Sequence, residues 1–349
     1  MLLWFLLAKI QKISLCANNF AFILYFCSMI ELFKDKKVLY VHGFASSGQS
    51  GTVTRIREQL TGATVIAPDL PIHPAEAMDL LNNVCASEKP DLIIGTSMGG
   101  MYAEMLRGFD RILVNPALKM ADSMKEHNMM GTQHFQNPRR DGVQDFFVDK
   151  ALVKEYREMT ERCFSGIDDE EQQRVWGLFG DEDTTVHTYD LFREHYRQAV
   201  RFHGEHRMND VSFLHSVVPV IRWISDRQEG RERPIVYIST RALTDKYGKP
   251  LSSSQKAVRQ LLDSYQLYFV ADAPVDANYY ADVNDWLYEY INVPAYGHTI
   301  FTNQLNLLYG DYLIDTQEVD GMATLIELGS DTFKTWDDII PYFERLGGQ

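Results

Sequence analysis

The pattern Gly-x-Ser-x-Gly at residues 95–99 is the feature that most constrains the fold of this chain. Three apolar residues at 92–94 precede it and a helical pattern follows, which predicts a strand, a sharp turn and a helix with Ser97 at the apex. Such a turn gives the serine an uncommon backbone conformation and leaves Gly95 and Gly99 room only for a hydrogen in place of a side chain. The stretch therefore predicts a nucleophile elbow, with the hydroxyl of Ser97 projecting above a sheet.

Short apolar runs alternate with amphipathic stretches on both sides of this turn. Repeated strand-helix units of this kind form a parallel sheet with helices on both faces. The predicted fold class is therefore α/β. The expected strands are 38–41, 64–67, 111–114, 174–179 and 199–202, and the expected helices lie near 52–60, 74–86, 189–196 and 211–224.

Residues 117–173 break this rhythm with a region rich in Met, His and charge, in which only 150–162 has a helical pattern. An insertion between core strands either forms a lid over Ser97 or is an irregular excursion of the surface. The sequence leaves both open, and with them the acyl length that a site at Ser97 would accept.

The stretch 227–234 is polar, charged and punctuated by Gly and Pro, which indicates a domain boundary. A second and smaller α/β series follows it. We therefore expect one domain at 29–226 and another at 227–349. Strands of the second domain are expected at 235–240, 267–271, 312–314 and 324–328, and helices near 252–265, 277–292 and 336–346.

Residues 1–28 are apolar, but lysines and an Asn pair interrupt them. They fit neither a secretory signal nor a spanning helix, which needs roughly 20 uninterrupted apolar residues. Met29 directly precedes the first good strand. The hypothesis is that translation begins at Met29, and the alternative is a membrane-associating anchor.

The net charge of −14 and the pI near 5.2 argue against nucleic acid or an anionic membrane as the main partner, because either needs a basic face. The cysteines form no CxxC pair and no framework spacing, so a disulfide scaffold or a structural zinc site is not expected. Reduced thiols and a cytoplasmic location are the interpretation. The four cysteines are Cys16, Cys27, Cys85 and Cys163.

A serine nucleophile needs a base, and the base needs a carboxylate to hold its tautomer. After an elbow of this kind the chain order is Ser, acid, His, each just after a strand. The loop after 174–179 offers two aspartates, and we prefer Asp183 because it fits Gly-x-x-Asp-x-x-Val, with Asp181 as the alternative acid. In the loop after 199–202, His206 is the preferred base, and His203 at the strand end is interpreted as structural.

Two backbone N–H groups are candidate donors to an oxyanion. One is that of Met98, because the helix after the turn directs its first N–H groups at the same point. The other lies in the loop after an early strand, where Phe44 is the candidate. His42 in this loop is expected to pack structurally beneath it.

These motifs together resemble the YqiA/YcfP-like esterases of the α/β-hydrolase superfamily over about residues 36–225. The resemblance implies hydrolysis of carboxylic esters or thioesters by a small hydrolase without metal or organic cofactor, with Ser97 as nucleophile and His206 as base. The family often places its acid where Asp181 stands. The motifs that carry the resemblance are 39–47, 68–71, 95–100, 114–117, 180–182 and 204–206.

The second half resembles the haloacid-dehalogenase fold, closest to its deoxyribonucleotidase branch, through 267–274 and 310–315. The resemblance implies an Asp-x-Asp after the first strand, but 239–241 reads Ser-Thr-Arg. Of the family's acidic motifs only Asp311 and Asp315 are interpreted as retained. We therefore expect a catalytically inactive module used for stability, ligand binding or homo-oligomerisation.

These motifs are compatible with three functions. The leading hypothesis is a serine esterase or thioesterase that acts on a small-molecule acyl ester or thioester. The alternative is a non-catalytic binding protein built from two eroded hydrolase folds. A phosphatase in 227–349 is the third, and the loss of the Asp-x-Asp argues against it.

Overall fold

The computed structural model describes residues 32–347, so the expectation for residues 1–28 lies outside the part described. The chain divides into two compact units. One contains the chain up to Val175 together with Thr185–Arg197, and the other contains Trp176–Thr184 and the chain from Gln198 onward. Within 32–347 no helix is both long and apolar enough to cross a membrane.

The first unit is built on parallel strands in the order β2-β1-β3-β4. Ile94 in β3 lies between Tyr40 of β1 and Ile112 of β4. These strands are nearly continuous apolar runs, as expected where helices cover both faces of a parallel sheet. The elements are β1 (Lys37–Val41), α2 (Gly51–Gln59), β2 (Thr64–Ile66), α3 (Pro74–Glu88), β3 (Leu92–Thr96), α4 (Met98–Met105) and β4 (Arg111–Val114).

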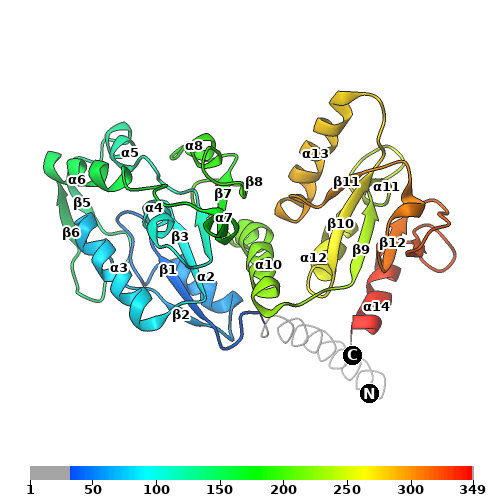
Figure 1. The fold of residues 1–349 in the computed structure, drawn as a ribbon, viewed down its shortest axis with the longest axis horizontal. Coiled ribbons are helices and arrows are strands. Elements are labelled where there is room, and N and C mark those ends of the chain that lie inside the picture. The colour runs from blue at the N-terminus through cyan, green and yellow to red at the C-terminus, as the bar shows by residue number, and fades with distance from the viewer. Residues whose placement is uncertain (1–31, 348–349) are drawn as a thin grey trace, which may run out of the picture. The chain divides into compact units, whose positions relative to one another are not determined.

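The insertion after β4 is ordered into helices and an antiparallel hairpin. Of these elements the sequence predicted only α6, whose buried face recurs at helical spacing. Asp149 caps α6 by accepting from the N–H of Leu152, and α6 packs on α3 and α5 (Figure 1). The elements are α5 (Met120–Glu126), β5 (Gly131–His134), β6 (Asp145–Val148), α6 (Lys150–Thr160) and α7 (Asp169–Arg174), and α8 (Tyr189–Arg193) also belongs to this unit.

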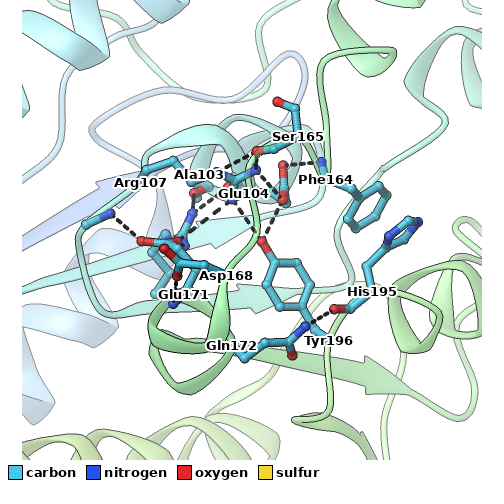
Figure 2. A network of polar contacts seen from close by, with 12 residues as sticks. Ala103, Glu104, Arg107, Phe164, Ser165, Asp168, Glu171, Gln172, His195 and Tyr196 are labelled. Carbon is cyan, nitrogen blue, oxygen red and sulfur yellow. Dashed lines mark hydrogen bonds and ion pairs between the residues drawn. The ribbon is translucent and has the colours of Figure 1, made fainter.

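A fully buried carboxylate, Glu104, ties the helix after the elbow to more distant segments (Figure 2). It accepts from the hydroxyl of Tyr196 at 2.7 Å and from the N–H of Phe164 at 3.1 Å, and it pairs with Arg107 at 3.0 Å. Arg107 in turn donates to the carbonyl of Ser165. Helix α4 is therefore held to the end of the insertion by charged hydrogen bonds.

A second buried pair joins β4 to helix α7. Arg111, which is also fully buried, donates to the carboxylate of Glu171 and to the carbonyl of Glu104. Glu171 accepts in addition from the N–H of Gly108 at 2.6 Å. Because buried charges are tolerated only when they are paired, these contacts fix the path of α7 against the strand.

In the second unit, β7 (Val175–Gly180) and β8 (Ala199–Phe202) pair in parallel. A helical stretch follows, in which one turn is a π-helix. It consists of α9 (Asp210–Ser212), η1 (Phe213–Val217) and α10 (Val218–Glu229), and the predicted boundary at 226/227 falls within its last turn. That boundary stays a prediction, because the compact unit also includes the residues before it.

The rest of the second unit is a five-stranded parallel sheet in the order β11-β10-β9-β12-β13, in which the strand order reverses at β9. Trp336 closes its core by donating to the carbonyl of Ala242 at 2.8 Å. Helices α12 and α14 pack together (Figure 1). The elements are β9 (Ile235–Ser239), α11 (Thr240–Leu243), α12 (Ser252–Leu261), β10 (Gln266–Ala271), α13 (Ala277–Ile291), η2 (Val293–Ala295), β11 (Thr299–Phe301), η3 (Leu305–Leu307), β12 (Tyr312–Asp315), β13 (Thr324–Glu327) and α14 (Trp336–Gly347).

The predicted α/β fold class is therefore confirmed, with parallel strands in the first unit and a five-stranded parallel sheet in the second. The elements that the sequence pattern did not show include the strand β11, the hairpin β5-β6 and the short helices α5, α7 and α11.

Glu171→Gln is expected to lower the free energy of unfolding by about 3 kcal/mol, because it leaves the Arg111 charge buried without its partner. Denaturant unfolding of the full chain measures this change. Glu170→Gln is the matched control, since Glu170 pairs with Arg174 on the surface with its side chain 74% exposed, and a change of at most about 0.5 kcal/mol is expected. Equal effects of the two substitutions would contradict the role given to the buried pair.

Candidate active site

Ser97 has the backbone conformation of a nucleophile elbow. It lies between β3 and α4 with φ 54° and ψ −121°, a backbone conformation that residues other than glycine rarely adopt. A Cβ on Gly95 would lie 2.7 Å from the Cβ of Ala103, and one on Gly99 would lie 2.6 Å from the carbonyl carbon of Val41. Both glycines are therefore required by close packing, as the sequence predicted.

The loop after β1 lies directly against this serine. A Cβ on Gly43 would be 3.3 Å from the Cβ and 3.8 Å from the Oγ of Ser97, so the next residue, Phe44, is also close to the nucleophile. The loop itself is strained, since Ala45 has φ 55°. The assignment of the Phe44 and Met98 N–H groups as oxyanion donors stays a prediction.

His42 is a structural residue of this loop. One ring nitrogen, Nδ1, donates to the carbonyl of Gly43 at 2.8 Å, and Nε2 accepts from the N–H of Leu70 at 3.0 Å. Burial lowers the pKa of His42 to about 4, so the imidazole stays neutral with a fixed tautomer. The expectation of a packing role for His42 is confirmed by these contacts.

The insertion covers the same loop. The ring of Phe146 on β6 meets that of Phe44 edge to face with centroids 5.3 Å apart, and the N–H of Gln136 donates to the carbonyl of Ala45 at 2.8 Å. Tyr156 on α6 also reaches Phe44, with ring centroids 6.4 Å apart. Of the two interpretations of residues 117–173, the structure therefore favours a cover, which packs on the loop after β1.

In the second unit the loops after β7 and β8 bring Asp183 to His206. The Oδ2 of Asp183 lies 2.8 Å from the Nδ1 of His206, and the two side chains are 3% and 20% exposed. A buried carboxylate at Nδ1 favours the tautomer in which Nδ1 carries the proton and Nε2 does not. This pairing is the one that the sequence offsets selected.

The alternative acid, Asp181, has different partners. Its Oδ1 accepts from the N–H of Gly204 at 3.0 Å, and its Oδ2 faces His203 at 3.3 Å in a pair whose side chains are 58% (His203) and 37% (Asp181) exposed. Asp181 therefore holds the loop after β8, which carries His203 and His206, to the end of β7.

The predicted site residues thus form two groups. Ser97, Phe44 and Met98 lie together in the first unit, and Asp183 and His206 lie together in the second. That the two groups form one triad stays a prediction.

The sequence pattern of the uncharacterised protein family UPF0227 matches residues 37–220, which include both groups. The chain belongs to this family. The match confirms the family that the motifs of the first half indicated.

Other similarities of this UPF0227 chain are more distant. A putative 5'(3')-deoxyribonucleotidase of Vibrio phage KVP40 is 26% identical over 139 residues, which are 38% of this chain and 77% of that protein. Among solved structures, Est1E from Butyrivibrio proteoclasticus (16% identity, 58% of this chain and 90% of that chain, TM-score 0.35) is similar. The thioesterase domain from the curacin biosynthetic pathway (17% identity, 54% and 91%, TM-score 0.32) is another.

The phage similarity agrees with the deoxyribonucleotidase resemblance of the second half. There, Arg241 follows β9 where the haloacid-dehalogenase resemblance implies the second aspartate. Its guanidinium binds both carboxylate oxygens of the buried Asp315, at 3.2 and 2.8 Å, and Asp272 at 2.8 Å. The bond to Asp315 raises the pKa of Arg241, so a fixed cation occupies the carboxyl ends of β9, β10 and β12.

The interpretation of Asp311 and Asp315 as one acidic pair is wrong. The Oδ2 of Asp311 accepts from the N–H of Ile235 at 2.7 Å, at the start of β9, whereas Asp315 ends β12. Four residues of extended strand separate them by about 13 Å. Nowhere in the described part of the UPF0227 chain do three or more His, Cys, Asp or Glu side chains gather as a metal site.

Gly99→Ala is expected to lower the free energy of unfolding by about 3 kcal/mol or more, because the added methyl group would overlap the backbone of β1. Gly51→Ala is the matched control: no atom lies within 4 Å of that Cβ, and the unfolding free energy should rise by about 0.5 kcal/mol. Thermal and denaturant unfolding measure both. A harmless Gly99→Ala would mean that the elbow is not packed as described.

Proposed function

We propose that this UPF0227 protein is a serine hydrolase that cleaves carboxylic esters or thioesters. Ser97 is the nucleophile, His206 the general base and Asp183 the residue that orients it, while the N–H groups of Phe44 and Met98 receive the oxyanion. The observation that carries the proposal is the strained elbow, because a serine with a packing role needs neither a positive φ nor close-packed glycines on both sides.

The Asp183-His206 pair supports the second half of the proposal. Chain order is Ser, Asp, His, and each residue follows a strand, as an α/β-hydrolase requires. The 2.8 Å contact at Nδ1 leaves Nε2 to take the hydroxyl proton of Ser97. The motif match to one family covers all three residues.

The reaction follows from these roles. As His206 Nε2 removes the proton, Ser97 Oγ bonds to the acyl carbon and the carbonyl oxygen becomes an oxyanion. The tetrahedral intermediate collapses, the C–O or C–S bond to the leaving group breaks, and the leaving group takes the proton from His206. Water then attacks the acyl-enzyme by the same steps and releases the acid. No metal or organic cofactor takes part in the proposal.

For residues 227–349 we propose a phosphatase-like module that has lost its chemistry. Phosphoryl transfer in the haloacid-dehalogenase family, as the resemblance implies, needs an aspartate nucleophile and a magnesium ion. Here the guanidinium of Arg241 neutralises Asp315 and Asp272, so a cation at this place would meet a like charge. This observation also favours the alternative function, a non-catalytic binding protein built from two eroded hydrolase folds.

Ser97→Ala is expected to abolish turnover of p-nitrophenyl esters and acyl thioesters, by about a millionfold in kcat, because the nucleophile is lost. Residues 29–349 with and without the substitution are compared over short and long acyl chains, and labelling by a fluorophosphonate is followed in parallel. Equal activity of both proteins would assign the hydrolysis to another site. Two inert, unlabelled and folded proteins would favour the binding function.

Asp183→Asn is expected to lower kcat by about ten-thousandfold, because an amide no longer stabilises the His206 imidazolium or fixes its tautomer. Asp181→Asn is the matched control in the same loop. Since Asp181 is partly exposed and binds backbone, about a fivefold effect at most is expected. Steady-state kinetics of the two variants decide between the acids, and the reverse ranking would make Asp181 the acid.

A further inference from the structure

Tyr156 is a buried residue of the insertion that contacts both candidate oxyanion residues. It lies on α6, one of the helices between β4 and β7, and is 1% exposed. Its hydroxyl lies 3.2 Å from the Sδ of Met98, and its ring meets the ring of Phe44 edge to face. Phe44 lies in the loop after β1 and Met98 begins helix α4, so one side chain links two segments that are far apart in sequence.

The same hydroxyl reaches a third segment. It lies 3.0 Å from the carbonyl of Ile72, in the stretch that also supports the oxyanion loop, because Leu70 donates to His42 and Asp69 accepts from Gly48. A phenol has a single hydrogen to donate, so it binds the Ile72 carbonyl or the Met98 sulfur at one time. Either bond keeps the side chain in the same place between the three segments.

Burial raises the pKa of the Tyr156 phenol, so it stays protonated at neutral pH. A phenol that stays protonated does not act as the general base of the reaction. Its contacts are instead those of a support, and oxyanion donors depend strongly on such support because their effect comes from fixed positions.

We propose that Tyr156 is a positioning residue through which the insertion holds the N–H groups of Phe44 and Met98 in register for the oxyanion. This inference rests on the proposed serine hydrolase function and extends it: through Tyr156 the insertion supports the oxyanion donors and does not only cover them. The Tyr156 ring packs against Phe44, and its hydroxyl hydrogen-bonds to Met98 or Ile72.

Tyr156→Phe keeps the ring and removes the hydroxyl, whereas Tyr156→Leu also removes the aromatic contact with Phe44. We expect kcat to fall about tenfold in the first and about a hundredfold in the second, as small displacements of donors do, with KM within about twofold of wild type. Affinity for a trifluoromethyl ketone, which forms an oxyanion with the serine, falls by the same factors as kcat.

Val153→Ala, which removes a buried apolar group from the same helix, controls for lost packing. It should lower the melting temperature and leave kcat within about twofold, as a stability effect alone does. Unchanged kcat in folded Tyr156→Leu, or a rise in KM alone, overturns the positioning role. If Tyr156→Leu does not fold, Tyr156→Phe decides by the same criteria.

Ser97→Ala, measured beside these variants, separates the two proposals. An active wild type, an inert Ser97→Ala and a fully active Tyr156→Leu would overturn only the positioning role. A wild type that is inert, or a Ser97→Ala protein as active as wild type, would overturn the hydrolase function and the positioning role with it.

Discussion

The backbone of Ser97 is the constraint to which the first unit is fitted. A non-glycine residue at φ 54° costs about 1–3 kcal/mol and persists only where its surroundings determine it. The N–H of Ser97 donates to the carbonyl of Val114, and its carbonyl accepts from Gly100, Met101 and Ala117. Two other residues with positive φ, Ala45 and Asn115, lie in the segments that follow the neighbouring strands β1 and β4. The turn is therefore held by hydrogen bonds from β4 and α4 and by glycines that let β1 approach.

The insertion extends this support outward. Its hairpin and helix α6 pack on the loop after β1. Its last residues contact α4 through Glu104 and β4 through the ion pair of Arg111 and Glu171. Charges this deeply buried define one arrangement, because any other would leave one of them without a partner. The elbow helix is thus fixed from both ends, by the turn at Ser97 and by the carboxylate of Glu104.

The features of the candidate site that the sequence predicted are those set by the spacing of residues close together in the chain. The elbow glycines and the offsets of Asp183 and His206 are local, so the pattern of a few residues was sufficient. The hairpin β5-β6 was missed because Gly131 to His134 are polar and lack the alternation of a half-buried strand. Tyr156 shows only as one apolar position of a helix, since its partners lie about 60 to 110 residues away in the sequence.

Residues 227–349 show a different reason why a sequence pattern can mislead. Two aspartates four residues apart resemble a metal-binding pair, but in an extended strand that spacing sends them to opposite ends of the sheet. Only Asp315 reaches the carboxyl edge at which the strand order reverses, where α/β sheets of this kind place their ligands. There Arg241 supplies the positive charge that a metal would otherwise bring. A guanidinium satisfies the buried carboxylate as well as a metal does, but it has no open coordination position and activates no water. The contact of Arg241 with Asp315 is therefore the basis of the proposal that residues 227–349 keep a phosphatase-like fold without its chemistry.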